Sequence, residues 1–216
     1  MKIPLKKEKP AVGKELVQQL RELDIEKAYA ATGQRTHTFY FRHTCAKLER
    51  ARDLFLFCVC AQGMEFVDLC YLRKTNVQNG VIRYVRRMTN QPVEVKVLPM
   101  MQEIIEKYST EDSPFLFDLL KSTEPDKMYT EYRCTTSQHR RFLQLLSLFL
   151  NLEYPLQHST ARDIWALASY NSGASLAFIA KAMGYASEAG AARYINSLKG
   201  VEDTSSNEDV VSTIFS

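Results

Sequence analysis

The residues of this chain with the clearest potential for chemistry lie in its C-terminal third. Tyr194 stands nine residues after Tyr185 in a Met183-Gly184-Tyr185 turn, and 32 residues after Arg162. A tyrosine hydroxyl can act as a nucleophile, and the planar guanidinium of arginine matches a phosphate or a carboxylate with two parallel hydrogen bonds. Each residue also has a simpler interpretation. A tyrosine on an amphipathic helix is commonly a half-buried core residue, and Arg162 could form a surface ion pair with Asp163.

Composition places the chain among ordinary globular proteins. It has 216 residues, of which 45% are hydrophobic and 25% charged, with a formal net charge of +3 and a pI of about 8.5. These values are unlike those of disordered or fibrous chains. Because the net charge is small, any attraction to nucleic acid must come from local basic clusters.

Several features predict a cytoplasmic protein. The N-terminus is charged and lacks the apolar core of a signal peptide, and no segment approaches the roughly 18 apolar residues of a membrane span. His37 and His43 lack ligand-like partners, so we expect no metal and no cofactor. The cysteines form no CxxC pair, and we expect buried thiols in a reducing compartment: Cys45, Cys58, Cys60, Cys70 and Cys134.

Hydrophobic patterning predicts a mainly α chain with a small antiparallel β-sheet, an α+β fold. Residues 1–10 read as a basic linker, followed by a helix to Leu23, a less regular insertion over 24–49 and a buried helix over 51–61. Alternation predicts strands at 81–87 and 93–97, after the Asn79-Gly80 turn. Further helices are expected from Pro99 and over 115–120, 142–152, 164–170, 176–183 and 189–198, before a flexible acidic tail at 201–216.

The order of Arg162, the glycine turn and Tyr194 resembles the end of a tyrosine recombinase (phage integrase family) catalytic domain. Three earlier segments look like the opening helices of such domains from Bacteroides-type mobile elements: Ala51-Arg52-Asp53-Leu54-Phe55-Leu56-Phe57, Gly63-Met64-Glu65-Phe66-Val67-Asp68-Leu69 and Tyr71-Leu72-Arg73-Lys74. The resemblance covers about residues 11 to 198. It implies the tyrosine recombinase catalytic-domain fold over residues 11–200 and a role in DNA recombination or DNA integration.

In that family a tyrosine attacks a DNA phosphate and forms a 3′-phosphotyrosine link. Two arginines hold the nonbridging oxygens, a lysine protonates the leaving 5′ oxygen, and a histidine with a second histidine or tryptophan completes the pocket. Carried over to this chain, Tyr194 matches the nucleophile and Arg162 the second arginine. The other positions depart from the pattern: Gln62 stands for the first arginine, Met88 for the lysine, Ser159 for the histidine and Tyr185 for the histidine or tryptophan.

These departures predict weak or absent strand cleavage. Removing one preorganised donor from a developing oxyanion commonly costs on the order of 3 kcal/mol, a factor of 10² to 10³ in rate. Losing three such groups would leave little activity, even though the losses do not add. Lys96, Arg87, His158 and Tyr185 are conceivable substitutes, but none obviously replaces Gln62.

The resemblance implies double-stranded DNA as the partner. The basic candidates for DNA binding are Arg83, Arg86, Arg87, Lys96, Arg140 and Arg141, although such charges could equally be solvated faces. Two alternatives to a recombinase remain. One is a catalytically inactive DNA-binding regulator or accessory subunit, and the other is a protein-interaction module that keeps the fold.

The two ends of the chain carry further expectations. Recombinases of this family normally have an N-terminal helical domain that clamps DNA, and this chain begins at what looks like the following linker. We therefore expect either a fragment or weak DNA binding. Near the other end, apolar residues predict a short tail that docks into a neighbouring subunit of a homo-oligomer on DNA: Val210, Val211, Ile214 and Phe215.

Overall fold

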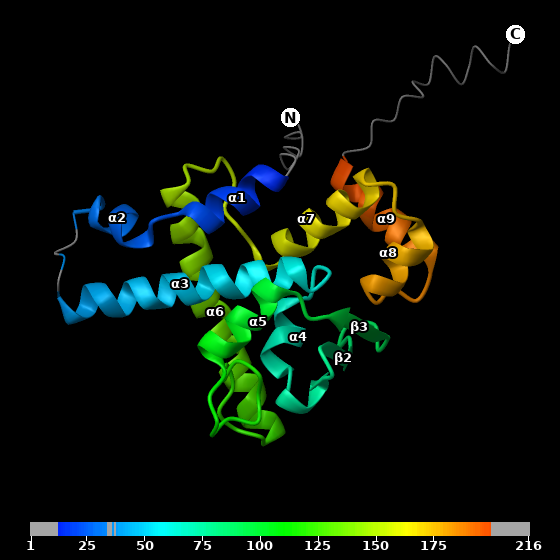
Figure 1. Cartoon of the computed structure of the whole chain (residues 1–216), viewed down its shortest axis with the longest axis horizontal. Coiled ribbons are helices and arrows are strands. Elements are labelled where there is room, and N and C mark those ends of the chain that lie inside the picture. The colour runs from blue at the N-terminus through cyan, green and yellow to red at the C-terminus, as the bar shows by residue number, and fades with distance from the viewer. Residues whose placement is uncertain (1–12, 34–35, 37, 200–216) are drawn as a thin grey trace, which may run out of the picture.

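A computed structural model describes residues 13–33, 36 and 38–199, so the expected linker at 1–10 and the expected tail at 201–216 lie outside the described residues. One long helix, α3 (Phe39–Cys60), runs through the middle of the molecule (Figure 1). Helix α2 (Ile25–Ala30) lies along its first half, and helix α1 (Lys14–Glu22) lies towards its second half. The C-terminal helices gather at its other end.

The first half of α3 corrects one prediction, because residues 39–49 are helical rather than irregular. The Thr38 side chain caps the helix by accepting a hydrogen bond from the Phe41 amide. Phe41, Cys45 and Leu48 recur at helical spacing and are all buried. Polar and aromatic neighbours on the exposed faces hid this period in the sequence.

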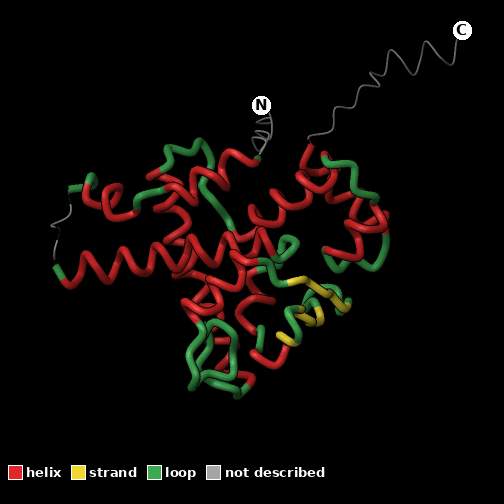
Figure 2. Tube along the Cα trace, in the orientation of Figure 1, coloured by secondary structure: helices red, strands yellow, loops and turns green. Residues whose placement is uncertain are grey.

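A three-stranded antiparallel sheet follows α4 (Phe66–Tyr71) and confirms the expected small sheet. Its strands are β1 (Val77–Gln78), β2 (Val81–Val85) and β3 (Pro92–Lys96), in the order β1-β2-β3. Figure 2 shows it as a short patch at the edge of a helical body. Strand β2 ends at Val85, two residues before the predicted end, because the backbone of Arg86 closes a tight turn with Asn90 and Gln91.

Helices α5 (Pro99–Tyr108) and α6 (Pro125–Phe149) follow the sheet, and the predicted helix over 115–120 between them is wrong. That segment is a loop that inserts Phe115, Phe117 and Leu120 into the core. Its backbone bonds to the residue that follows α4 rather than within a helix, since the Leu116 amide donates to the Leu72 carbonyl. An apolar run this short does not distinguish a helix from a buried loop.

The last helices, α7 (His158–Asn171), α8 (Leu176–Ala182) and α9 (Glu188–Lys199), surround a second apolar cluster. It contains Ala166, Ile179, Met183 and Ile195 and is smaller than the main core around α3. This cluster fixes α7, α8 and α9 relative to one another, and therefore also Arg162, Tyr185 and Tyr194.

The described cysteines follow the buried-thiol prediction only in part. Cys45, Cys58 and Cys70 are buried and Cys60 is half-buried, whereas Cys134 is exposed on α6. Within residues 13–33, 36 and 38–199, no helix has both the length and the apolar character that crossing a membrane requires.

Candidate active site

Three of the predicted site residues meet at the junction of α7, α8 and α9. The guanidinium carbon of Arg162 lies 5.2 Å from the centroid of the Tyr185 ring and 5.8 Å from that of the Tyr194 ring. The two tyrosine rings lie 5.9 Å apart. Residues separated by 32 positions in the sequence therefore form one cluster, which we call the Tyr194 cluster: Arg162, Tyr185 and Tyr194, together with the neighbours described below.

The turn that carries Tyr185 requires a glycine. Gly184 has a φ of +65°, and a Cβ at this position would lie 2.8 Å from Val93 Cγ2 and 3.1 Å from Arg86 Cδ. The hairpin also holds the turn by hydrogen bonds, because the Thr89 hydroxyl donates to the Gly184 carbonyl at 2.6 Å. The loop between β2 and β3 thus packs directly under the cluster.

Arg162 is buried and joins three segments through its terminal nitrogens. Nη1 donates to the Gly63 carbonyl at 3.0 Å and Nη2 to the Met183 carbonyl at 2.7 Å. The approach is close, since a Cβ on Gly63 would lie 2.9 Å from the Arg162 Cα. Both Nη groups are therefore bonded to backbone carbonyls, and the Nε group is buried without a hydrogen-bond partner.

Arg86 is a second buried guanidinium in the cluster, and its position corrects an expectation. As a candidate DNA contact it was expected on the solvent face of the hairpin, but only 2% of the residue is exposed. Its guanidinium carbon lies 5.2 Å from the Tyr185 centroid, and Nη1 donates to the Gly184 carbonyl. The alternation of the strand already indicates that Arg86 is buried, because Arg86 is in phase with the buried Ile82 and the half-buried Tyr84.

Glu65 is the residue of the cluster that the sequence analysis missed. One carboxylate oxygen, Oε1, accepts a hydrogen bond from Arg86 Nη2 and lies 3.8 Å from Arg162 Nε. Its side chain is 20% exposed, against 3% and 5% for the two arginines. A single carboxylate thus lies between two buried cations. Nothing in its residue type or spacing distinguishes it from other acidic residues of the chain.

The hydroxyl of Tyr194 donates to Asp163 Oδ1 at 2.5 Å, and Asp163 is only 4% exposed. Burial raises the pKa of Tyr194 well above its usual value, and the negative charge of Asp163 raises this pKa further. The phenol is therefore protonated at neutral pH. A nucleophilic attack would require its proton to leave, and Asp163 is the acceptor in contact with it.

Met88 and Gln62 occupy different places relative to this cluster. Met88 is exposed at its rim, with its sulfur 3.7 Å from Arg86 Nη2. The Gln62 side chain instead lines a cavity of about 690 Å³ between the hairpin and α8, beside Tyr84 and Phe178. Its Oε1 atom is buried there without a hydrogen-bond partner. Met88 therefore touches the cluster through Arg86, whereas Gln62 lines the neighbouring cavity.

Ser159 lies in the first turn of α7, exposed beside a separate cavity of about 430 Å³ that Arg140 and His158 also line. His158 stacks on Phe66 at 4.5 Å and on His139 at 5.0 Å. Burial lowers the pKa of His158 to about 4 and that of His139 to about 3, with the neighbouring imidazole contributing to the latter. The imidazoles are therefore neutral stacking groups, and His158 belongs to this stack rather than to the Tyr194 cluster.

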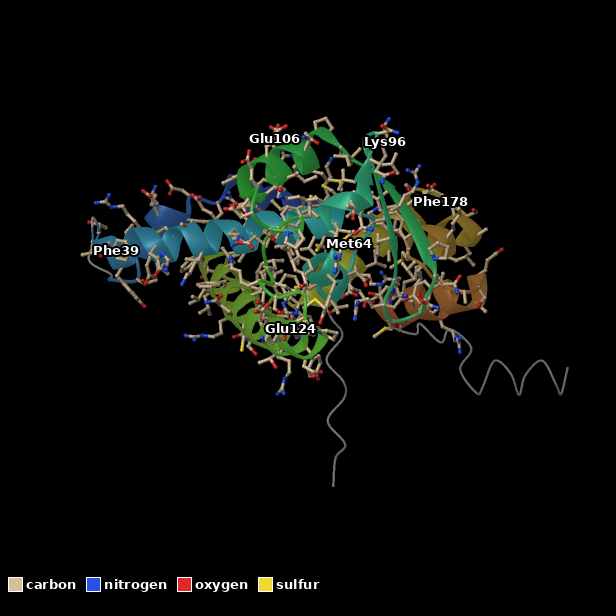
Figure 3. The ribbon with its side chains drawn as sticks, turned by 90° about the horizontal axis from the view of Figure 1, so that it is seen from below. Phe39, Met64, Lys96, Glu106, Glu124 and Phe178 are labelled. Carbon is tan, nitrogen blue, oxygen red and sulfur yellow. The ribbon has the colours of Figure 1, made fainter. Side chains whose placement is uncertain are left out.

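The remaining basic candidates are exposed side chains. Arg83 forms an exposed ion pair with Glu94, and Arg87 lies 3.9 Å above the Tyr71 ring. Lys96 projects from the end of β3, at the edge of the molecule in Figure 3, and Arg140 and Arg141 are exposed on α6. Across the described parts of the chain, no three histidine, cysteine, aspartate or glutamate side chains are grouped to hold a metal ion.

Neither a protein-family model nor a curated protein sequence matches the chain, whereas solved structures do. XerA recombinase matches with a TM-score of 0.58 and 17% identity, over 94% of this chain and 62% of its own. A lambda integrase dimer bound to a COC′ core site matches with a TM-score of 0.52 and 13% identity, over 88% of this chain and 48% of its own. A lambda integrase(75-356) dimer bound to a COC′ core site matches with a TM-score of 0.50 and 15% identity, over 82% of this chain and 57% of its own.

These comparisons confirm the predicted fold, which is mainly α with a small antiparallel sheet as in tyrosine recombinase catalytic domains. The chain spans less than two thirds of the length of each of these structures.

Proposed function

We propose, from the fold shared with XerA recombinase and lambda integrase, that this chain binds double-stranded DNA as a tyrosine recombinase or integrase-type domain. Its role would be site-specific DNA recombination or integration, in the cytoplasm and on behalf of a mobile element, with weak or absent strand cleavage. One observation supports the proposal that strand cleavage is weak or absent. The two buried arginines beside Tyr185 already donate to the protein's own oxygen atoms.

Strand cleavage would require these groups to be free. A phosphate oxygen is held by guanidinium N–H groups directed at it, but one N–H of each Nη group of Arg162 already donates to a backbone carbonyl, which leaves fewer donors for a phosphate. The Tyr194 proton is held by Asp163 in a buried site, which disfavours the nucleophilic phenolate. Arg86 and Arg162 face the carboxyl groups of Glu65, Asp68 and Asp163, so two cations meet three carboxyl groups. The cluster therefore lacks the excess positive charge that a phosphate needs.

DNA binding would use the exposed cations rather than the buried ones. The solvent-accessible candidates are Arg83, Arg87 and Lys96 on the β2–β3 hairpin, with Arg140 and Arg141 on α6. The lambda integrase structures are dimers on DNA, and we propose a homo-oligomer for this chain as well. The apolar segment at 210–215, proposed as its docking tail, lies outside the described residues.

A gel shift on duplex DNA at several salt concentrations tests the binding. Each phosphate contact contributes about 0.9 to the slope of log K against log salt, so we expect a steep loss of affinity with salt. Replacing Arg87 by alanine should reduce this slope by about 1, whereas Lys127→Ala, an exposed cation paired with Glu124 on α6, serves as the matched control. If the chain does not bind duplex DNA even at low salt, the protein-interaction module becomes the better proposal.

Trapping on a nicked suicide substrate tests the chemistry. We expect the parent chain to give little or no covalent adduct with DNA. A substantial adduct that disappears in Tyr194→Phe would show an active nucleophile and would refute the proposal of weak cleavage. DNA binding without any adduct would favour the second candidate, a DNA-binding regulator or accessory subunit, which the internally bonded arginines already favour.

A further inference from the structure

We infer that the first turns of α3 form a nucleic-acid-binding surface separate from the Tyr194 cluster, and that this surface takes single-stranded nucleic acid. We call it the outer-end surface, and it consists of Phe39, Tyr40, His43 and Lys47. The inference does not depend on the proposed recombinase function, because it uses none of the residues proposed to contact duplex DNA.

Two aromatic side chains of the outer-end surface are exposed, although the residue that follows them is buried. Phe39 is 84% exposed, the largest value for a big apolar side chain in the described parts of the chain, and Tyr40 is 68% exposed. Phe41 is instead buried and stacks on Tyr29 of α2, with ring centroids 5.2 Å apart. Packing of α3 against α2 therefore explains Phe41, whereas the neighbouring exposed rings are available to a partner.

A stripe along one face of α3 joins an aromatic ring to a cation. Phe39, His43 and Lys47 follow one another at intervals of four residues, so they lie on the same face of the helix. The Phe39 and His43 rings are stacked, with centroids 5.7 Å apart and an angle of 11° between their planes. This stack orients the Phe39 ring while most of its surface stays open to a ligand.

The charge of this segment suits a polyanion. Residues 27–48 contain no aspartate or glutamate, but they contain four basic residues: Lys27, Arg35, Arg42 and Lys47. Their formal charge of +4 exceeds the +3 of the entire chain. Arg35 lies outside the described residues. Cations in a segment without acids attract the phosphates of a nucleic acid.

The exposed rings favour a single strand over a duplex. The bases of a duplex are stacked on one another, whereas an unpaired base can stack on an aromatic side chain. Cations beside the rings then hold the phosphates of the strand. Phe39 and Tyr40, with Lys47 nearby on the same helix, therefore suit unpaired bases.

The outer-end surface lies far from the Tyr194 cluster. Helix α3 has 22 residues and is about 33 Å long, and the C-terminal helices gather at its other end (Figure 1). Figure 3 shows Phe39 and Phe178, which belongs to α8, near opposite edges of the molecule. A single strand at Phe39 and a duplex at the cluster would therefore occupy different sites.

Fluorescence anisotropy of the full chain with a labelled oligo(dT) strand, and separately with a labelled duplex, tests the inference. Stacking on an aromatic side chain commonly tightens binding by about 5- to 150-fold per base. We therefore expect the double variant Phe39→Ala with Tyr40→Ala to bind the single strand at least about fivefold more weakly than the parent. Its affinity for the duplex should equal that of the parent.

Two further variants sharpen this test. Lys47→Gln should reduce the slope of log K against log salt for the single strand by about 0.7, the contribution of one phosphate contact. Phe178→Ala is the matched control, because it removes a ring that is 51% exposed at the opposite edge of the molecule, and it should leave single-strand binding unchanged. Circular dichroism checks that each variant is folded.

Photo-crosslinking of the parent chain to a strand that contains bromodeoxyuridine gives a readout that needs no variant. We expect adducts on Phe39 or Tyr40. Adducts found only outside residues 27–48, or a folded double variant that binds the single strand as tightly as the parent, would overturn the inference. A parent that does not bind the single strand at low salt would also overturn it, and the surface would then be assigned to a protein partner.

The two oligonucleotides separate this inference from the proposed function. Failure to bind the duplex would leave the outer-end surface standing if the single strand still binds through Phe39 and Tyr40. Failure to bind the single strand would leave the proposed duplex binding standing.

Discussion

Replacing Gly184 by alanine should measure how tightly the hairpin and the α8–α9 turn are joined beneath the Tyr194 cluster. The backbone at Gly184 has a φ of +65°, a conformation that costs an L-residue about 1–2 kcal/mol. The added Cβ would also lie 2.8 Å from Val93 Cγ2 and 3.1 Å from Arg86 Cδ. Val93 is 2% exposed in a packed strand, so it cannot move away without disturbing its neighbours.

Gly173 provides a control with the same backbone conformation and no steric conflict. Its φ is +84°, and a Cβ there would meet no atom within 4 Å. Both substitutions restrict the unfolded chain equally, so that contribution cancels in the comparison. What remains is the overpacking at Gly184, which typically costs about 1–3 kcal/mol. We therefore expect Gly184→Ala to lower the free energy of unfolding by about 1–3 kcal/mol more than Gly173→Ala.

Urea denaturation of the parent and of both variants, followed by circular dichroism, gives the three free energies. The slopes of the transitions must agree for the comparison to hold, because a changed slope would indicate a different unfolded or native state. Losses that agree to within about 0.5 kcal/mol would refute the idea that the turn is packed rigidly on Val93 and Arg86, since uncertainty in such values is of that order.

The other predictions concern titration. Asp163→Asn should lower the pKa of Tyr194, because it removes a negative charge in contact with the hydroxyl. Ultraviolet difference titration measures this pKa, with the same variant carrying Tyr194→Phe as the control. An unchanged pKa would mean that burial alone raises the pKa of Tyr194. His139 should make the protein less stable in mild acid, because its pKa is about 3 in the folded protein and near 6.5 in the unfolded chain. The contribution of the neutral imidazole to the free energy of unfolding is therefore complete above about pH 6.5 and decreases as the pH falls. Between pH 7 and pH 5 this loss should be about 2 kcal/mol, and His139→Gln should reduce it. A loss between pH 7 and pH 5 that is equally large in the parent and in His139→Gln would contradict the neutral imidazole stack.

The sequence predicted the fold better than it predicted the surroundings of the site. The order of Arg162, Gly184 and Tyr194 was informative because a glycine turn and two helices leave little freedom in how those residues meet. The expectation for Arg86 was wrong because a charged side chain usually faces solvent, whereas Arg86 directly follows β2 and continues its phase, in which Ile82 and Tyr84 mark the inward face. The position of Glu65 in the site could not be predicted from the sequence, since it depends on two arginines that lie 21 and 97 residues away, and no local pattern encodes contacts over such a separation.

The bonds of Arg162 to the Gly63 and Met183 carbonyls have a consequence for how relatives of this chain would be classified. Through these bonds, the arginine holds α7 to the α3–α4 turn and to the α8–α9 turn. Selection for folding would therefore preserve it even after any catalytic activity had been lost. Its presence in a related sequence would then say little about activity.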